Sequence, residues 1–396
     1  MKPHIAILGS GPTGLEAALA AAEAGFPFTV YEAAPEAAGN VRAWGHVRLF
    51  TPWEMNVSPR MRRHLEEAGI AVPVGPGCPT GHELAEKLLA PLAALPSIAP
   101  NLRLGARVLA IGREGLLKHE EISTPERGRR PFRLLLTDSS GREWTENAST
   151  VIDATGTYGH PNRLGDGGIP APGERALDGD IHRAVPDFAQ ESNWAGKTIL
   201  LAGAGHSAQT AVRDLAELAR QAPGTRVVWA LRGSAEPSWG THDGDPLPDR
   251  ARLAAEACAL AGGASPAVET RRGVAIKGLS RTNGKLKVAL RNGAGSEDVE
   301  VDRVLSLTGY VGDHELYRQL QVHECYATCG PMKLSAALLG AAGGDCLTQS
   351  THGVQTLTNP EPGFYILGIK SYGRNNTFLM RVGWEQVAEV FGALGD

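Results

Sequence analysis

Two short glycine-rich segments have the spacing that binds the pyrophosphate of a dinucleotide. The first is Gly9-Ser10-Gly11-Pro12-Thr13-Gly14, and the second is Gly203-Ala204-Gly205-His206-Ser207-Ala208. In this pattern the first glycine permits a tight turn, the second lets the backbone approach the phosphates, and the third lets a helix pack closely on a strand. The N-terminus of that helix then faces the negative charge. Alanine in the third position, as in the second segment, is a variant that such sites tolerate.

The residue at the end of the strand that follows each segment differs in charge. Glu32 closes the first unit, at a spacing that suits a carboxylate accepting hydrogen bonds from ribose hydroxyls. Arg232 holds the equivalent position in the second unit. A guanidinium forms charge-assisted bonds with a 2′-phosphate, which an acid would repel. We therefore expect NADPH rather than NADH at the second turn, with an ordinary surface arginine as the alternative. His206 is expected either to touch phosphate or to cap the helix.

The elements that position these residues occur twice along the chain. Each copy is a β-turn-α-β unit, followed by antiparallel strands and closed by an apolar strand that meets a glycine. The first copy comprises strands at 4–8, 28–32, 103–111, 132–137 and 151–156, with a helix at 15–24. The second comprises strands at 198–202, 226–232, 273–279, 285–290 and 304–309, with a helix that ends near residue 221.

A Gly- and Pro-rich stretch at 159–173 separates the copies and is typical of a linker. A strand at 363–368 and a helix at 377–394 then indicate a return to the first domain. We therefore predict an α/β protein with two Rossmann-like three-layer domains, one inserted in the other. The predicted domains are 1–165 with 325–396, and 175–310.

The two units, their Thr-Gly strand ends and the C-terminal return resemble those of flavoproteins with two dinucleotide-binding domains. This group includes thioredoxin-reductase-like enzymes and flavin-containing monooxygenases. The stretch at 154–161, Ala-Thr-Gly-Thr-Tyr-Gly-His-Pro, is similar to a linker in bacillithiol-disulfide-reductase-like proteins and small monooxygenases. Gly179 to His182 is similar to a monooxygenase signature, one residue shorter. The resemblance implies that the first domain binds FAD, that the inserted domain binds NAD(P)H, and that hydride passes from the nicotinamide to the flavin.

The resemblance also implies the residues that hold each cofactor. On the FAD side these are Gly9, Gly11, Pro12, Thr13, Gly14, Glu32, Val108, Thr155, Gly156 and Gly368. On the NADPH side they are Gly203, Gly205, His206, Ser207, Ala208 and Arg232. The family has an aspartate after the glycine of the return strand, where this chain reads Gly368-Ile369-Lys370. We expect Lys370 or Arg374 to bind FAD phosphate, and the helix that starts near Thr377 to direct its N-terminus at the flavin.

Two inserts, at 42–100 and 238–263, fall outside the repeat and are expected either to carry specificity or only to pack. In the first, Trp44, His46, Arg48 and Trp53 are candidates for the rim of the flavin pocket. Arg48 is the residue we expect to contact FAD or substrate, with a surface ion pair as the alternative. In the second, Trp239, His242 and Asp243 are expected to close over the nicotinamide or to pack.

The five cysteines include no CxxC pair of the kind that dithiol reductases place against the flavin. Cys325 and Cys329 have three residues between them and are expected to be structural, whereas Cys346 and Cys78 are candidates for a single reactive thiol. The missing dithiol favours a monooxygenase, in which reduced FAD and O2 oxygenate a nitrogen, a sulfur or a ketone. Phe50, where monooxygenases of this group have an asparagine, is a departure. The alternatives are a reductase of a low-molecular-weight disulfide and a nucleotide-binding module with little turnover. The sequence points to no catalytic acid or base, and flavin hydride chemistry does not require one.

Composition excludes several other classes of protein. Of the 396 residues 42% are hydrophobic, which allows a sizeable core, and the net charge of -4 does not favour a nucleic-acid partner. No apolar run approaches a membrane span, and five cysteines do not form a disulfide framework. We expect a soluble, cytoplasmic protein with a small-molecule substrate and no metal, and we leave a homodimer open.

Overall fold

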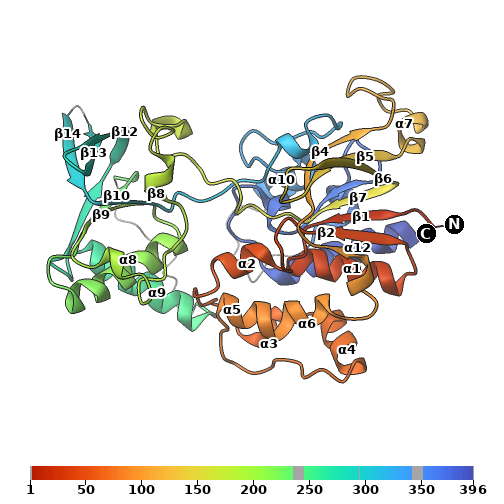
Figure 1. Ribbon diagram of the computed structural model, residues 1–396, viewed down its shortest axis with the longest axis horizontal. Coiled ribbons are helices and arrows are strands. Elements are labelled where there is room, and N and C mark those ends of the chain that lie inside the picture. Colours follow the sequence, from red (N-terminus) through yellow and green to blue (C-terminus); the bar gives the residue numbers. More distant parts are fainter. Residues whose placement is uncertain (1, 235–244, 294, 341–350, 396) are drawn as a thin grey trace. The chain divides into compact units, whose positions relative to one another are not determined.

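The structure is a computed structural model that describes residues 2–234, 245–293, 295–340 and 351–395. The chain divides into two compact units (Figure 1). Unit 1 contains the residues up to His160 and those from Val311 onward, and unit 2 contains Pro161–Tyr310. Unit 2 is thus inserted in unit 1, and each is built on a parallel sheet, which confirms the predicted fold class.

A five-stranded parallel sheet forms the centre of unit 1, in the order β16-β7-β1-β2-β3. Its strands are β1 (Ile5–Leu8), β2 (Phe28–Tyr31), β3 (Leu102–Arg103), β7 (Thr150–Asp153) and β16 (Phe364–Ile366). Ile5 pairs with Phe28 on one side and with Thr150 on the other. The last strand of the chain, β16, pairs with β7, so the C-terminal segment completes the sheet that the N-terminus begins.

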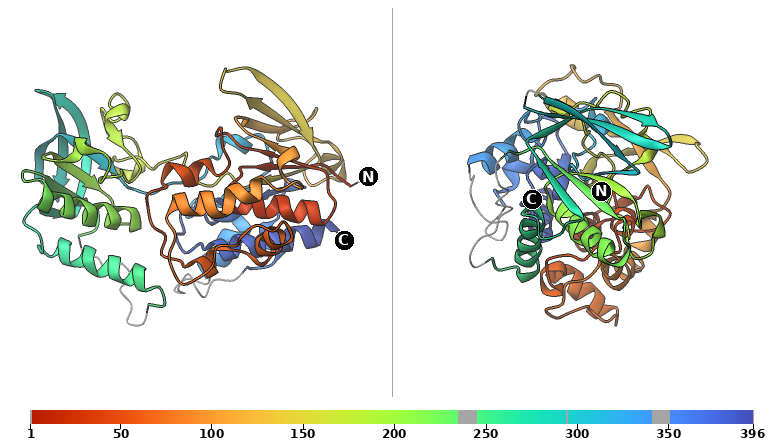
Figure 2. Two further views of the ribbon diagram at one scale, coloured as in Figure 1. Left: turned by 60° about the horizontal axis from the view of Figure 1, so that its bottom comes forward. Right: turned by 90° about the vertical axis from the view of Figure 1, so that its left-hand side faces the viewer.

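The two faces of this sheet are covered by different layers. Ile5 and Ile7 belong to a core with helices α1 (Pro12–Glu23) and α12 (Met380–Gly395). Ala6 and Leu8 belong to a core with the antiparallel sheet β4-β5-β6. Alternate residues face opposite sides because the strand repeats every two residues. Figures 1 and 2 show the resulting three layers of unit 1. The antiparallel strands are β4 (Arg107–Arg113), β5 (Phe132–Thr137) and β6 (Glu143–Ala148).

The first insert is helical and shares the core of unit 1. Met61 and Leu65 of one helix and Leu84, Leu88 and Leu92 of the next segment are all buried in the core that contains Ile5. The helical segment from Gly81 to Ala93 contains a π-helical turn in its middle. The elements are α2 (Gly39–Ala43), α3 (Trp53–Asn56), α4 (Pro59–Glu67), α5 (Gly81–Leu84), a π-helix (Ala85–Leu89) and α6 (Ala90–Ala93).

Unit 2 repeats the layers of unit 1. Its parallel sheet has the order β11-β10-β9-β15-β8, and a three-stranded antiparallel sheet packs on one face through Val274, Val288 and Leu290. The parallel strands are β8 (Ile181–His182), β9 (Thr198–Ala202), β10 (Arg226–Leu231), β11 (Val268–Arg272) and β15 (Arg303–Ser306). The helices are α8 (His206–Gln221) and α9 (Pro248–Ala261), and the antiparallel strands are β12 (Val274–Thr282), β13 (Lys285–Asn292) and β14 (Gly295–Val301).

The helix expected from Thr377 begins three residues later, at Met380. Thr377 lies in the preceding loop, where its backbone N–H and its hydroxyl both donate to Asn375 Oδ1 (3.0 and 2.7 Å). No helix within the described ranges is long and apolar enough to cross a membrane. The remaining helices are α7 (Pro125–Arg129), α10 (Met332–Gly340), α11 (Val354–Leu357) and short 3-10 turns at Ala99–Asn101, Asp166–Gly168, Asp178–Asp180, Ser192–Trp194, Glu315–Tyr317 and Gly368–Tyr372.

Candidate functional site

The three glycines of the first turn are required for different reasons. Gly9 has φ +91°, and a Cβ there would lie 2.9 Å from the carbonyl oxygen of Ala154. A Cβ on Gly14 would collide with the carbonyl oxygen of Gly9. A Cβ on Gly11, at the N-cap of α1, would meet nothing within 4 Å. The chain itself therefore excludes side chains at the outer positions, whereas the middle position borders open space at a helix N-terminus. Helix N-termini of this kind bind pyrophosphate in dinucleotide-binding folds.

The second turn has the same geometry. Gly203 has φ +133°, and a Cβ there would collide with the carbonyl oxygen of Leu307. Gly205, the N-cap of α8, again borders open space. Ala208 is fully buried, which explains why a small residue is needed at the third position. Both turns thus present an open backbone at the start of a helix.

Glu32 organises the first turn from within the protein. Its Oε2 accepts the Ser10 N–H (2.9 Å) and hydroxyl (2.6 Å), and its Oε1 accepts the Ala34 N–H (2.9 Å). The residue is only 8% exposed. A carboxylate offers roughly four acceptor positions, so three bonds leave capacity for one from a ribose hydroxyl.

Lys370 lies in a different environment from the one expected. Its ammonium donates to Asp153 Oδ2 at 2.6 Å and to the Thr155 hydroxyl at 3.2 Å, and both members of the ion pair are buried. Asp153 Oδ1 also accepts the N–H and hydroxyl of Thr155 (3.1 and 2.7 Å). The lysine therefore holds the Asp153–Thr155 turn, and a direct bond to FAD phosphate does not fit this geometry. Sequence reasoning missed Asp153, although a carboxylate inside an apolar closing strand indicates a buried partner.

The C-terminal return packs directly on the first glycine turn. Gly368 has φ +74°, and a Cβ there would lie 2.8 Å from the Thr13 hydroxyl. A Cβ on Gly383 of α12 would lie 2.9 Å from the same hydroxyl. Thr13 therefore fills the space between the return segment and α12, so both glycines are needed for this close approach. Arg374 is exposed, and its backbone N–H donates to Thr328 O at 2.6 Å.

The residues expected to form the flavin rim lie in different environments. Trp53 is 8% exposed and belongs to the core of unit 1, so it does not form a rim. Arg48 is exposed, and its guanidinium donates to the carbonyl of Cys78. Trp44 packs against Tyr158 with ring centroids 6.0 Å apart. Trp44 Nε1 and His46 Nε2 are buried without a hydrogen-bond partner in the described part of the chain, so they are the two unsatisfied polar atoms in this region of the insert. Val108 lies half-buried on β4 and packs on the core that lies between the parallel and antiparallel sheets of unit 1.

The carboxyl end of β10 presents a free cation. Arg232 is exposed directly after the strand and makes no ion pair within the described ranges. On the neighbouring strand β11, Arg271 is already paired with Glu269 and Glu297. His206 is half-buried at the start of α8, and burial, followed by the charge of Arg250, lowers its pKa. His206 is therefore a neutral group at pH 7 and not a second cation.

Several expected residues lie outside the part of the chain that the structure describes. Trp239, His242, Asp243 and Cys346 lie outside the described residues. Among the described residues, no group of three His, Cys, Asp or Glu could hold a metal ion.

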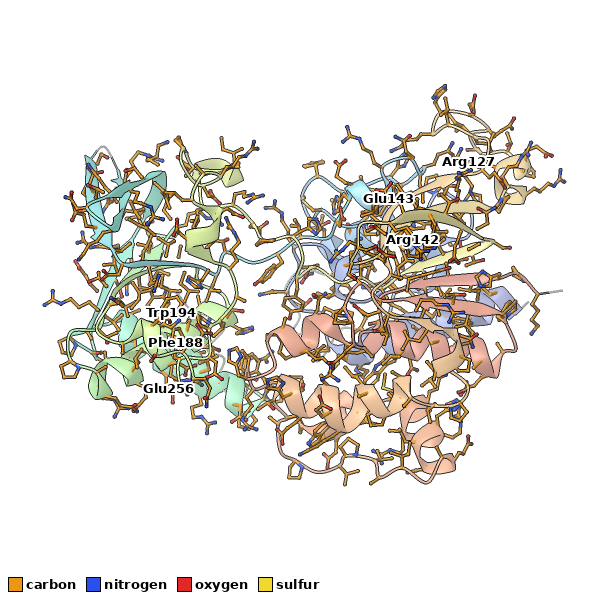
Figure 3. The ribbon with its side chains drawn as sticks, viewed as in Figure 1. Arg127, Arg142, Glu143, Phe188, Trp194 and Glu256 are labelled. Carbon is orange, nitrogen blue, oxygen red and sulfur yellow. The ribbon has the colours of Figure 1, made fainter. Side chains whose placement is uncertain are left out.

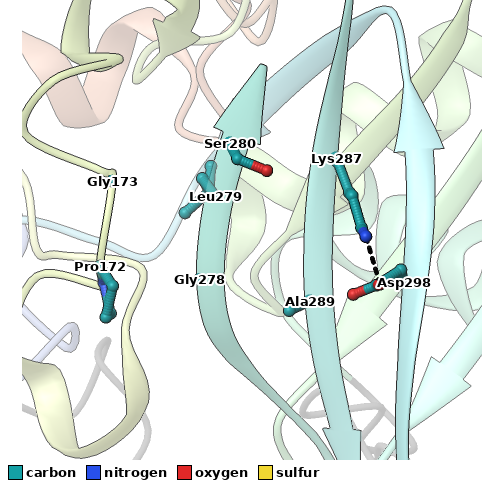
Figure 4. A pocket seen from close by; sticks show the side chains of 8 residues that line it. All are labelled: Pro172, Gly173, Gly278, Leu279, Ser280, Lys287, Ala289 and Asp298. Atoms are coloured by element: carbon teal, nitrogen blue, oxygen red, sulfur yellow. Dashed lines mark ion pairs between the residues drawn. The ribbon is translucent and has the colours of Figure 1, made fainter. Parts of the chain in front are cut away.

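Two cavities lie away from the glycine-rich turns. One, of about 300 Å³, lies beside Lys287, whose ammonium pairs with Asp298 at 2.6 Å (Figure 4). A second, of about 350 Å³, includes Glu36 and Ala37, which follow Glu32 in the chain. Neither cavity is lined by residues of the glycine-rich turns at 9–14 and 203–208.

Comparisons with solved structures show that the fold is shared with two-dinucleotide-binding-domain FAD oxidoreductases. Bacillithiol disulfide reductase from Bacillus cereus aligns with a TM-score of 0.67 and 16% identity over 100% of this chain and 99% of that chain. Thioredoxin reductase from T. acidophilum gives 0.59 and 15% over 99% and 98%. Ornithine N-hydroxylase from Kutzneria sp. 744, solved with reduced FAD, NADP+ and L-ornithine, gives 0.61 and 15% over 99% of both chains. No family model and no curated protein matches the sequence.

Proposed function

We propose that this chain is an NADPH-dependent FAD oxidoreductase that acts on a small molecule. The observation that carries the proposal is the pair of turns whose middle glycines, Gly11 and Gly205, border open space at helix N-termini. Glu32 after the first turn suits a ribose, and the free Arg232 after the second suits a 2′-phosphate. When bound, FAD supplies the step in which electrons pass from a nicotinamide to a second acceptor.

The chain offers a specific set of residues to each cofactor. Unit 1 would hold FAD through Gly9, Gly11, Pro12, Thr13, Gly14, Glu32, Val108, Thr155, Gly156 and Gly368. Unit 2 would hold NADPH through Gly203, Gly205, His206, Ser207, Ala208 and Arg232. Lys370 would not contact FAD itself but would hold Asp153 and Thr155 in place through its hydrogen bonds. The cavity beside Glu36 and Ala37 is the space we assign to the adenine, because it opens along the segment after Glu32.

We further propose that reduced FAD passes its electrons to O2 and oxygenates a small substrate at nitrogen, sulfur or a ketone. No CxxC is present anywhere in the sequence, so the chain lacks the dithiol through which a flavin reduces proteins. An ornithine N-hydroxylase is among the structures that share the fold, which supports an amine as the first substrate to test. Trp44 Nε1 and His46 Nε2 are buried donors or acceptors that a bound polar group would satisfy.

The alternative is reduction of a low-molecular-weight disulfide. It is favoured by the bacillithiol disulfide reductase from Bacillus cereus, whose TM-score of 0.67 exceeds those of the other two structures compared. This reaction would need either a single cysteine or none.

The two reactions are separated by following the fate of the electrons. The purified, FAD-loaded protein is reduced with one equivalent of NADPH without oxygen and then mixed rapidly with O2 or with a small disulfide. An oxygenase consumes one O2 per NADPH and yields hydrogen peroxide without substrate, whereas a disulfide reductase releases two thiols per NADPH. Replacing all five cysteines by alanine one at a time provides the control, because unchanged thiol release in every variant excludes a thiol mechanism. If NADPH reduces the flavin no faster than NADH does, the assignment of the second site is wrong.

A further inference from the structure

The segment Cys325–Gly330 forms a closed turn with a cysteine at each side. The Cys325 N–H donates to Gly330 O (2.8 Å), and the Cys329 N–H donates back to Cys325 O (2.7 Å). Glu324 and Pro331 pair just outside the turn. Cys329 has φ +58°, a left-handed conformation that usually requires glycine or asparagine. Both cysteines are free thiols.

Several donors converge on the Cys325 sulfur. Hydrogen bonds from the backbone N–H and the hydroxyl of Thr328, and from the backbone N–H of Ala327, lower the pKa of the Cys325 thiol. The Thr328 and Ser335 hydroxyls are 2.6 Å apart and buried, so both are held in place. Donors fixed around a sulfur favour the thiolate, which is the nucleophilic form.

The turn is accessible from solvent at its tip. Tyr326 is 95% exposed and Ala327 is exposed, whereas Cys325 is 5% exposed and Cys329 is half-buried. Only a small reagent can reach the Cys325 sulfur in this setting. Cys329 follows one turn later, and cysteines whose Cα atoms are within about 7 Å can be bridged with little backbone movement.

We propose that Cys325 and Cys329 form a reversible oxidation site for small peroxides, with Cys325 as the attacking thiol and Cys329 as the resolving thiol. The Cys325 thiolate attacks one peroxide oxygen, so that an S–O bond forms, the O–O bond breaks and water or an alcohol leaves. The Cys329 thiol then attacks the Cys325 sulfenic acid, an S–S bond forms and water leaves. The two thiols lose two electrons to the peroxide, and a dithiol reductant reverses the reaction by exchange.

This site does not depend on the proposed flavin reaction, but its oxidation would act on a segment of the flavin-binding unit. The carbonyl of Thr328, inside the turn, accepts the Arg374 N–H at 2.6 Å, and a Cβ on Gly330 would lie 2.9 Å from Ser371 O. Drawing the two cysteines together contracts the turn that holds this carbonyl. We therefore expect oxidation to expose the amide of Arg374 to hydrogen exchange.

Peptide mass spectrometry tests the proposal directly, because trypsin releases both cysteines in one peptide, Gln319–Lys333. The reduced protein is treated with a small excess of hydrogen peroxide and then alkylated. We expect this peptide to lose two hydrogens and to resist alkylation until dithiothreitol is added, while Cys78 and Cys258 stay alkylatable. In Cys329→Ser the sulfenic acid at Cys325 should instead be trapped by dimedone.

Thr328→Val provides a variant that keeps both cysteines and removes one hydroxyl donor. We expect its Cys325 to react with iodoacetamide at pH 7 about tenfold more slowly, whereas Cys258 reacts at the wild-type rate. The proposal is overturned if the wild-type peptide remains a dithiol after peroxide, or if Cys325 reacts no faster than Cys258. Thermal unfolding of each variant, measured alongside, separates loss of reactivity from loss of the fold.

Discussion

Arg232 is the residue that would give the proposed NADPH site its positive charge. It is exposed at the carboxyl end of β10 and unpaired in the described chain, whereas the nearby Arg271 is committed to two glutamates. A charge-assisted hydrogen bond contributes about 1.5–3 kcal/mol, so Arg232→Ala should raise the KM for NADPH about 10- to 150-fold. The KM for NADH should not change, because NADH has no 2′-phosphate.

The control for this prediction lies on the same strand. Arg226 is also exposed but begins β10, at the opposite end from the nucleotide turn. Arg226→Ala should therefore leave both KM values unchanged in stopped-flow reduction of the flavin. Equal losses for NADPH and NADH in Arg232→Ala would show that the residue supports the domain rather than the phosphate.

Lys370 is a buried cation, and its one anionic partner within the described ranges is the equally buried Asp153. Removing one member of such a pair leaves a charge without compensation and costs about 3–5 kcal/mol. Lys370→Met should therefore lower the free energy of unfolding by about that amount in urea, and Asp153→Asn combined with Lys370→Met should recover part of the loss. Lys287→Met, which breaks the exposed Lys287–Asp298 pair, should have little effect. A Lys370→Met protein as stable as the wild type would contradict this prediction.

At the scale of elements, Glu361 links the antiparallel sheet of unit 1 to the C-terminal return. Its carboxylate accepts Arg113 from β4 (2.6 Å) and Arg127 from α7 (2.8 Å), and all three side chains are buried (Figure 3 labels Arg127). Glu361→Gln leaves two buried guanidinium groups without a counter-charge, so we expect a loss of about 3–5 kcal/mol in thermal or urea unfolding. Proteolysis should increase first in the loop between β4 and α7. The matched control is Glu126→Gln, which breaks only an exposed pair with Arg129.

The edge strand β8 ends in a histidine that should make stability depend on pH. His182 packs against Trp194 with ring centroids 4.6 Å apart, and Phe188 contacts the same tryptophan edge-to-face (Figure 3). Burial first, and then Arg303, lowers the pKa of His182, while Glu191 and Asp180 oppose the shift. The folded protein then binds fewer protons than the unfolded chain below about pH 6.5, so this residue makes stability fall as the pH falls through that range.

His182→Gln should reduce this acid sensitivity. The difference in Tm between wild type and variant at pH 8 measures the cost of altered packing, because the histidine is neutral in both states there. That difference should shrink as the pH is lowered toward about 5. If it stays constant or grows, His182 is not the group that titrates.

Repeated patterns made the strands and helices of both units predictable. The segment at 132–137 is β5 and that at 198–202 is β9, because short apolar runs between turn residues have few other folds available. Strands β6, β8, β11 and β14 were not predicted. β14 is mostly exposed and includes Glu297, Asp298 and Glu300, so its pairing comes from β13 rather than from its own sequence. The helix expected at Thr377 starts at Met380 because Asn375 captures the Thr377 N–H.

At the scale of the whole molecule, the inserted arrangement was predictable because the two glycine patterns and the C-terminal strand fix the order of elements. Partners far apart in sequence were not predictable. Asp153 and Lys370 are 217 residues apart, and Arg113 and Glu361 are 248 apart, so no local pattern joins them. The sequence predicts that Glu32 binds a ribose. Its hydrogen bonds to Ser10 could not be predicted, because they depend on the folded turn.

The inserted arrangement predicts that FAD and the nicotinamide cofactor each bind a different unit of the chain. Hydrogen exchange can test this, because a bound ligand slows exchange of the amides that it contacts or orders. FAD added to the FAD-depleted protein should slow exchange at Gly11–Gly14 and at Thr155–Gly156, with no change at Gly205–Ala208. NADP+ should slow exchange at Gly205–Ala208 and near Arg232, and Arg232→Ala should abolish this at the same NADP+ concentration. Each effect should be absent when the other ligand is added alone. FAD protection at Gly205, or NADP+ protection at Gly11, would reverse the assignment of the turns, because both are open helix N-termini and only Glu32 and Arg232 distinguish them.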